Sequence, residues 1–165
     1  MKGAGAGLKL KRRHFLKRSE VKELGRRLSE LFGTHPPLEG LEVAVTEGRT
    51  EVFFRSGQPV LIREGGRLFP TVKALLNGLF SLPRVVVDMG AVPYVTRGAD
   101  VMLPGIRSVD ETVRRGSIVV VVDETHGKPL AVGESLLDAD EILAGGKGRA
   151  VKNLHWVGDK YWHLK

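Results

Sequence analysis

The step Leu82-Pro83, near the middle of the chain, separates two halves with different sequence patterns. A residue before proline is pushed out of the helical region, so no helix is expected to continue through this step. The half before it combines helical periodicity with short strand-like runs, whereas the half after it has β-branched runs with glycine at nearly every junction. The sequence therefore predicts one domain over residues 19–82 and a second over residues 83–165, preceded by an arm of residues 1–18.

The first domain is predicted to be a compact α+β unit. From Ser19, an expected N-cap, apolar residues recur at helical spacing until Gly33. Pro70 suits the first turn of a second helix. Between the two helices lie three strand-like runs, and the spacings between them are short enough for an antiparallel meander: residues 41–47, 51–55 and 59–63.

The second domain is predicted to be a small β barrel or sandwich. Residues 118–122 do not alternate between apolar and polar side chains, so this run is expected to lie centrally or to be covered on both sides. A turn at residues 125–128 leads into the next strand, and residues 138–143 suit a short helix with acidic residues at its start. The β-branched runs that support this prediction are residues 84–87, 117–122 and 149–154.

The positive charge of the chain is concentrated at its start. The whole sequence has 26 Lys and Arg against 19 Asp and Glu, which gives a net charge of +7. Residues 1–18 hold all of this excess, because they contain no acid. Nothing before Arg13 offers a periodic apolar face, so the segment is expected to be a mobile arm that attracts nucleic acid only nonspecifically. Its seven cations are Lys2, Lys9, Lys11, Arg12, Arg13, Lys17 and Arg18.

The composition excludes several kinds of chemistry. The chain has no cysteine, which rules out disulfides, thiolate zinc sites, iron-sulfur clusters and cysteine nucleophiles. No stretch approaches the roughly 20 apolar residues of a membrane span, and the basic start is not followed by the apolar segment of a signal peptide. His155 and His163 lie eight residues apart without a third metal ligand nearby. We therefore expect a soluble, cytoplasmic protein that uses no metal and no cofactor.

Residues 88–106 carry the most specific pattern in the chain. Two Gly-Ala pairs, Gly90-Ala91 and Gly98-Ala99, lie eight residues apart, and the second leads through Asp100 into an apolar run closed by Pro104-Gly105. This pattern resembles the PUA domain, the RNA-binding module of pseudouridine synthases and archaeosine transglycosylases. The resemblance covers roughly residues 83–160 and continues through residues 116–121, 131–134 and 146–151.

The whole chain is similar to the MCT-type proteins, which are named for malignant T-cell amplification and also called translation-machinery-associated proteins. The segments that carry this closer match are residues 69–76, 82–83 and 153–163. The resemblance implies an archaeal member of the family with an α+β pre-PUA domain packed on a PUA pseudobarrel. It also implies binding to the small ribosomal subunit or to tRNA during initiation, reinitiation or recycling, and a density-regulated-type protein partner.

The loop that holds the second Gly-Ala pair is a candidate RNA contact, as the corresponding loop is in PUA domains. Gly98 and Ala99 remove side-chain bulk where a helix turns into a strand, so backbone N–H groups could approach a phosphate or a base directly. Arg97 beside them adds a planar guanidinium with several donors. The alternative is that Gly98, Ala99 and Pro104-Gly105 only make tight turns and close packing in the barrel.

A second candidate contact is the basic segment of residues 147–152. Strand alternation places Lys147, Arg149 and Val151 on one face and Gly148, Ala150 and Lys152 on the other. Lys147 and Arg149 are therefore predicted to line one side of an RNA groove. The alternative is an ordinary solvated edge strand, because lysine commonly protects such edges from aggregation.

Three functions remain open from the sequence. The first is an RNA-binding, translation-associated protein, and the second is an accessory or enzyme subunit of RNA modification. Residues 1–82 show no nucleotide loop, metal constellation or paired catalytic acids, so no catalytic residue is expected. The third makes the first domain a docking surface for a protein partner. The aromatic cluster Trp156, Tyr161 and Trp162 either pins the chain end as core or stacks on bases.

Overall fold

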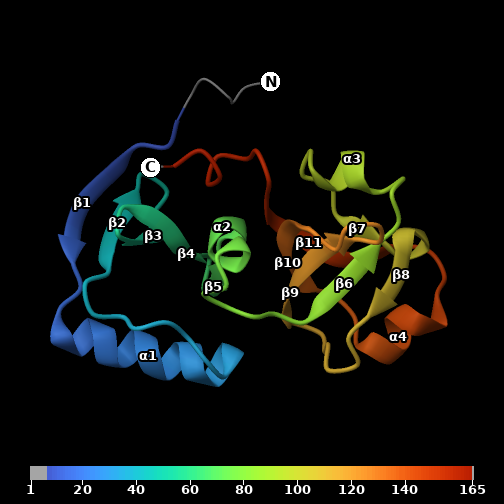
Figure 1. Ribbon diagram of the computed structural model, residues 1–165, viewed down its shortest axis with the longest axis horizontal. Helices are drawn as coiled ribbons and strands as arrows, with labels where there is room; N and C mark the ends of the chain where they lie inside the picture. The colour runs from blue at the N-terminus through green and yellow to red at the C-terminus, as the bar shows by residue number, and fades with distance from the viewer. Residues whose placement is uncertain (1–6, 165) are drawn as a thin grey trace. The chain divides into compact units, whose positions relative to one another are not determined.

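The computed structural model describes residues 7–164. Internal contacts divide the chain into two units, Met1–Ser81 with His163–Lys165 and Leu82–Trp162 (Figure 1). The division lies between Ser81 and Leu82, one residue before the step Leu82-Pro83, and His163 and Leu164 belong to the first unit and not to the second.

The first unit is a five-stranded antiparallel sheet with one long helix. The strands follow one another in the order β1-β2-β3-β4-β5, which confirms the predicted meander for its central strands. Leu24 and Leu28 of the helix pack into one core with Val43, Phe53 and Leu61 of the sheet. The elements are β1 (Leu10–Phe15), α1 (Arg18–Phe32), β2 (Glu42–Thr46), β3 (Glu51–Arg55), β4 (Gln58–Glu64), β5 (Arg67–Pro70) and α2 (Val72–Leu76).

The expectation of a mobile arm over residues 1–18 is wrong for β1. This segment is the edge strand of the sheet and pairs with β2, with Leu10 opposite Thr46 and Phe15 opposite Glu42. Its side chains are almost all exposed, so the strand is held by backbone pairing and shows no apolar period in the sequence. Residues 1–6 lie outside the described part of the chain.

The starts of both helices differ from the predicted positions. Helix α1 begins at Arg18 after Lys17, whose N–H donates to the Glu20 carboxylate at 2.8 Å, so Ser19 is not the N-cap. Pro70 ends β5 and does not open the second helix. Thr71 caps α2 instead, because its hydroxyl accepts a hydrogen bond from the Ala74 N–H at 3.0 Å.

The second unit is a barrel-like, six-stranded sheet in the order β7-β11-β10-β9-β6-β8. Strands β6 and β9 are parallel and the other pairs are antiparallel. The elements are β6 (Arg84–Val87), α3 (Val92–Val95), β7 (Val101–Met102), the 3₁₀ helix η1 (Leu103–Gly105), β8 (Ile106–Val109), β9 (Ile118–Asp123), β10 (Pro129–Ser135), α4 (Ala139–Ala144) and β11 (Arg149–Trp156).

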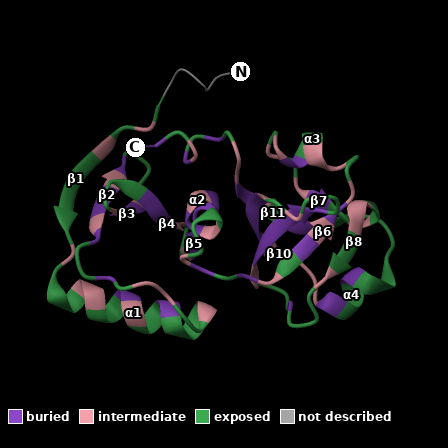
Figure 2. Ribbon diagram, in the orientation of Figure 1, coloured by how far each residue is buried: buried purple, intermediate pink, exposed green. Residues whose placement is uncertain are grey.

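Two details of the second unit confirm the predictions. Strand β9 lies between β10 and β6, and its four valines, Val119 to Val122, are all buried. The neighbouring strand β10 is also mostly buried (Figure 2). Helix α4 begins after Asp138, whose N–H donates to the Glu141 carboxylate at 2.9 Å, and ends at Gly145. The continuous apolar run therefore predicted the buried strand β9 correctly, and the acidic cap predicted the short helix α4.

Candidate nucleic-acid interface

The two candidate segments of the sequence lie side by side at one edge of the second unit. Strand β7 pairs with β11, with Met102 opposite Arg149 and Val101 opposite Val151. Next to this pair, the Leu103 N–H donates to the Gly148 carbonyl at 2.9 Å. The structure thus brings together the loop of residues 97–105 and the segment of residues 147–152.

The glycine of the loop is required for packing. Gly98 has φ of +99°, a conformation that side chains with a Cβ rarely adopt, and an added Cβ would lie 2.7 Å from Cζ2 of Trp156. The N–H groups of Gly98 and Ala99 donate to the carbonyls of Val95 and Tyr94, each at 3.0 Å. The prediction that these N–H groups face a phosphate or a base is therefore wrong, because they close the end of α3.

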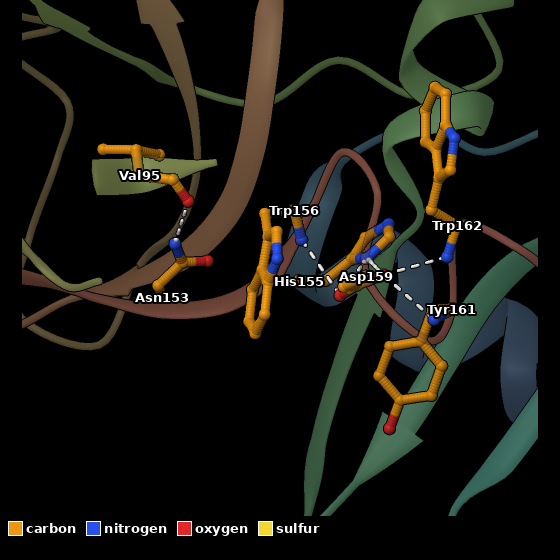
Figure 3. A network of polar contacts seen from close by, with 7 residues as sticks. All are labelled: Val95, Asn153, His155, Trp156, Asp159, Tyr161 and Trp162. Atoms are coloured by element: carbon orange, nitrogen blue, oxygen red, sulfur yellow. Dashed lines mark hydrogen bonds and ion pairs between the residues drawn. The ribbon is translucent and has the colours of Figure 1, made fainter. Parts of the chain in front are cut away.

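Asp100 and Asn153 join this loop to β11. One Asp100 carboxylate oxygen accepts the Asn153 N–H and the other accepts the Arg149 guanidinium, both at 2.9 Å. The Asn153 side-chain amide donates to the carbonyl of Val95 at 3.1 Å (Figure 3) and to the carbonyl of Ala99 at 3.0 Å. The loop is thereby fixed before any ligand arrives, which lowers the conformational cost of binding.

The predicted alternation at the start of β11 is wrong. Lys147 lies in a bend before the strand, and Ala150 and Val151 are both buried, because the pairing with β7 shifts register between Arg149 and Val151. Lys147, Arg149 and Lys152 are nevertheless all exposed. The exposed Arg97 makes no ion pair within residues 7–164, whereas Arg149 is paired with Asp100.

A pocket of about 280 Å³ opens beside these cations. Its wall is mainly apolar, and its large exposed side chains are Tyr94, with 64% of its surface accessible, and Met102, with 47%. An aromatic ring and a polarizable thioether suit the face of a planar base. The lining residues are Ala91, Tyr94, Val95, Ala99, Asp100, Val101, Met102 and Gly105.

The sequence pattern did not single out Tyr94, and it included Met102 only as part of the apolar run that follows Asp100. The signal for Tyr94 was an aromatic residue between the two Gly-Ala pairs, in a segment too short for a helical period. Pro104 is exposed in η1, and Gly105 lines the pocket, where an added Cβ would lie 3.3 Å from Cβ of Ala91. Both residues therefore shape the rim that follows β7.

The aromatic cluster near the chain end holds the ring that packs on Gly98. Asp159 is buried and accepts the N–H groups of Trp156 at 3.0 Å and of Tyr161 and Trp162 at 2.9 Å (Figure 3). Its carboxylate also lies 2.9 Å from Nδ1 of the buried His155. Tyr161 is buried and Trp156 contacts the core, so these two residues serve packing.

Within residues 7–164, no three His, Cys, Asp or Glu side chains gather in an arrangement that would hold a metal ion. In that part of the chain, no helix has the length and apolar character needed to cross a membrane.

Two family models match the chain. The PUA domain matches residues 83–157, and a domain of unknown function, DUF1947, matches residues 12–77. The first match covers the edge and the pocket described above, and the second covers most of the first unit.

Several relatives match over most of their length. An uncharacterized protein of Methanocaldococcus jannaschii is 37% identical over 96% of this chain and 99% of its own. Malignant T-cell-amplified sequence 2 of Homo sapiens is 31% identical over 91% of this chain and 90% of its own. Translation machinery-associated protein 20 of Saccharomyces cerevisiae is 27% identical over 78% and 75%.

Solved structures of archaeal proteins share the fold. A hypothetical protein of Pyrococcus horikoshii has a TM-score of 0.77 at 36% identity, covering 92% of this chain and 98% of that one. A conserved PUA domain protein of Thermoplasma acidophilum has a TM-score of 0.76 at 32% identity, covering 90% and 95%. The predicted α+β architecture, a pre-PUA domain followed by a PUA domain, is confirmed. The chain belongs to the family of PUA-domain proteins that includes malignant T-cell-amplified sequence 2 and translation machinery-associated protein 20.

Proposed function

We propose that the chain binds structured RNA at the edge formed by α3, β7 and the start of β11. The observation that carries this proposal is the pocket walled by Tyr94 and Met102 beside the exposed Arg97, Lys147 and Arg149. An apolar slot of this size accepts one unstacked base, and the cations around it contact the adjoining phosphates. The PUA domain of the chain is the RNA-binding module of its family.

The RNA is tRNA or the ribosomal RNA of the small subunit, and the protein acts in the cytoplasm during initiation, reinitiation or recycling. Support comes from the relative in Saccharomyces cerevisiae, which is named for its association with the translation machinery. The pocket adds a chemical preference, because only an unpaired loop or end can splay a base into it. Crosslinking with sequencing of the bound RNA, together with sedimentation with small subunits, separates these two RNAs.

The charged residues are tested by reversing one charge at a time. We expect Arg97→Glu to weaken binding of tRNA or of small subunits about tenfold, because a charge-assisted contact to phosphate is lost and a repulsive charge replaces it. Arg84→Glu is the matched control, since Arg84 is also exposed and forms no ion pair within residues 7–164, and it lies on β6, outside the pocket. Arg149→Gln is preferred to Arg149→Glu, because a second acid beside Asp100 would disturb the loop. Equal affinities of the folded Arg97 and Arg149 variants and the wild type would exclude this interface.

The pocket is tested by removing its aromatic ring. Tyr94→Leu keeps the apolar bulk but removes the stacking surface, and we expect the affinity to fall at least about fivefold. Leu143→Ala, a change of an exposed side chain on α4, serves as the control. An unchanged footprint on the RNA after Tyr94→Leu would show that no base enters the pocket.

The proposal assigns no catalytic step to the chain. The alternative is an RNA-modification protein that uses its PUA domain to hold tRNA or ribosomal RNA. Incubation of the purified protein with unmodified tRNA, followed by mass spectrometry of the nucleosides, distinguishes the two functions. Turnover by the chain alone would replace the proposed function with catalysis.

A further inference from the structure

Strand β1 and its flanks form the most cationic surface among the described residues. Lys9, Lys11, Arg12, Arg13, Lys17 and Arg18 are all exposed. Two of them form ion pairs with acids of β2 and of the turn that follows it. Nη2 of Arg13 lies 3.2 Å from Oε1 of Glu42, and Nζ of Lys11 lies 3.9 Å from Oε2 of Glu47. The other four form no ion pair within residues 7–164, so this edge keeps an unbalanced positive charge that the sequence concentrates here.

A bulge in β1 places one of these unpaired cations in a strained conformation. Lys11 pairs with Val45 and His14 pairs with Val43, so Arg12 and Arg13 together oppose the single residue Ala44. Arg12 has φ of +57°, which lies in the left-handed region. This conformation is unfavourable in free energy for any residue that has a Cβ atom. A glycine would form the same bulge without this strain. The observed arginine therefore indicates a use for the guanidinium at this position.

The two neighbouring arginines of the bulge play different parts. The guanidinium carbon of Arg13 lies 3.9 Å from the centroid of the buried Phe54 ring, and its charge is paired with Glu42, so Arg13 covers the sheet. Arg12 has neither contact. At the end of the strand, Phe15 is 66% exposed, the highest value among the large apolar side chains of the described chain. An unpaired cation and an open aromatic ring therefore occur on one strand, and the other unpaired cations lie in the segments that flank it.

Protection of an open sheet edge accounts for only part of this arrangement. Lysines and bulges commonly keep an edge strand from pairing with other molecules. Such protection explains neither an exposed Phe15 nor a strained arginine where glycine would suffice. The opposite edge of the same sheet is the four-residue strand β5, which is blunted by its shortness and by Pro70. Cations with an interleaved aromatic side chain are instead the arrangement that binds single-stranded nucleic acid.

We propose that β1 is a second RNA-binding surface, located on the first unit and tolerant of sequence. Arg12 and its unpaired neighbours, Lys9 and Lys17, contact backbone phosphates, and Phe15 stacks on an unpaired base. The proposal rests on the proposed function in that it takes RNA as the ligand. It adds a contact outside the PUA domain that strengthens the binding of all RNAs alike, whereas the pocket at α3 and β7 selects among them.

The decisive variant is Arg12→Gly in the full chain, compared with Arg49→Gly. Both arginines are exposed with positive φ, +57° and +68°, and both changes remove one positive charge and relieve backbone strain. Arg49 lies in the turn between β2 and β3 and is not part of β1. We expect both variants to melt at or above the wild-type temperature. Only Arg12→Gly is expected to weaken binding of tRNA and of a mixed-sequence single-stranded oligoribonucleotide, by about fivefold for each.

Salt dependence and stacking give independent readings of the same surface. Arg12→Gly should reduce the slope of log affinity against log salt concentration by about 0.7, the value for one phosphate contact of a single strand. Phe15→Leu keeps an apolar side chain but removes the ring. It should lower the affinity for both RNAs about fivefold and leave the slope of log affinity against log salt concentration unchanged. Leu76→Ala, at another exposed apolar residue of the first unit, should change neither quantity.

The outcomes separate this inference from the proposed function. Full affinity of Arg12→Gly and Phe15→Leu, with weakened binding by Arg97→Glu, would overturn the second surface and leave the first. Equal losses in Arg12→Gly and Arg49→Gly would mean that overall charge alone matters, which also overturns it. Aggregation of the β1 variants with unchanged RNA affinity would mean that the cations of β1 only protect the sheet edge. An altered preference among RNAs would contradict the proposal that this surface binds RNA independently of sequence.

Discussion

The two sheet edges that present cations to solvent, β1 in the first unit and β7 with β11 in the second, are held in place by different means. Strand β1 is kept by backbone pairing to β2 and a few exposed ion pairs. The second edge is fixed by a partly buried network in which Asn153 bonds to the loop and Asp159 holds Trp156, whose ring packs on Gly98. The first edge holds most of the net positive charge of the chain. The second edge holds the pocket lined by Tyr94 and Met102, in a domain whose positive and negative charges are equal in number. Net charge and a site built for selection are therefore separate properties of this molecule.

The largest effect that would test this comparison is expected from Asp159→Ala. The change leaves three backbone N–H groups and the buried His155 without their acceptor, so we expect a loss of about 3–5 kcal/mol in the free energy of unfolding. Amide hydrogen exchange should accelerate in β10 and β11. Exchange in β2 and β3 should stay the same, and equal acceleration there would show that the network supports both units.

Gly98→Ala is expected to have the next largest effect. The new Cβ would overlap the Trp156 ring and would hold a non-glycine residue at φ of +99°, which together cost about 2–3 kcal/mol. Thermal unfolding measures the loss, and the double variant with Trp156→Leu should recover the part due to overlap. No recovery in the double variant would show that backbone strain alone sets the cost.

Arg12→Gly sharpens the comparison because its effect on stability has the opposite sign. Relief of the left-handed conformation exceeds the entropy that glycine gains in the unfolded chain, so we expect the free energy of unfolding to rise by about 0.5–1 kcal/mol. Chemical denaturation provides the measurement. A destabilised variant would mean that the Arg12 side chain makes contacts that hold β1 to the sheet.

The smallest effect is expected for Arg149→Gln. The ion pair with Asp100 is exposed on the arginine side, and surface pairs of this kind contribute about 0.5 kcal/mol. Stability should therefore stay nearly constant while RNA affinity falls, as measured on the same preparation. A loss of several kcal/mol would assign Arg149 to the network that fixes the loop and not to the ligand.

Elements that bury a continuous apolar run or carry a capping pattern could be predicted from the sequence. The valines of β9 and the acids at the start of α4 are examples, because their local pattern and their final environment agree. The PUA pattern also placed the two basic candidate segments in one domain.

Other features depend on partners that are distant in the sequence. Strand β1 has no apolar period, since it pairs through its backbone and its side chains are almost all exposed, and the charge pattern therefore suggested an arm. The alternation predicted from Lys147 fails because the shift in register opposite β7 is not encoded locally. The pocket with Tyr94 appears only when α3 and β7 are brought together, and the role of Gly98 depends on Trp156, which lies 58 residues away in the sequence.

The return of the chain end to the first unit has a consequence for the order of assembly. The first unit consists of Met1–Ser81 and His163–Lys165, with the second unit inserted between them, and Leu164 is buried. During synthesis, the second unit can therefore fold as an uninterrupted segment, whereas the first unit is completed only when His163 and Leu164 have emerged. The unit that begins earlier in the sequence is thus completed later, so removal of Leu164 is expected to weaken the first unit more than the second.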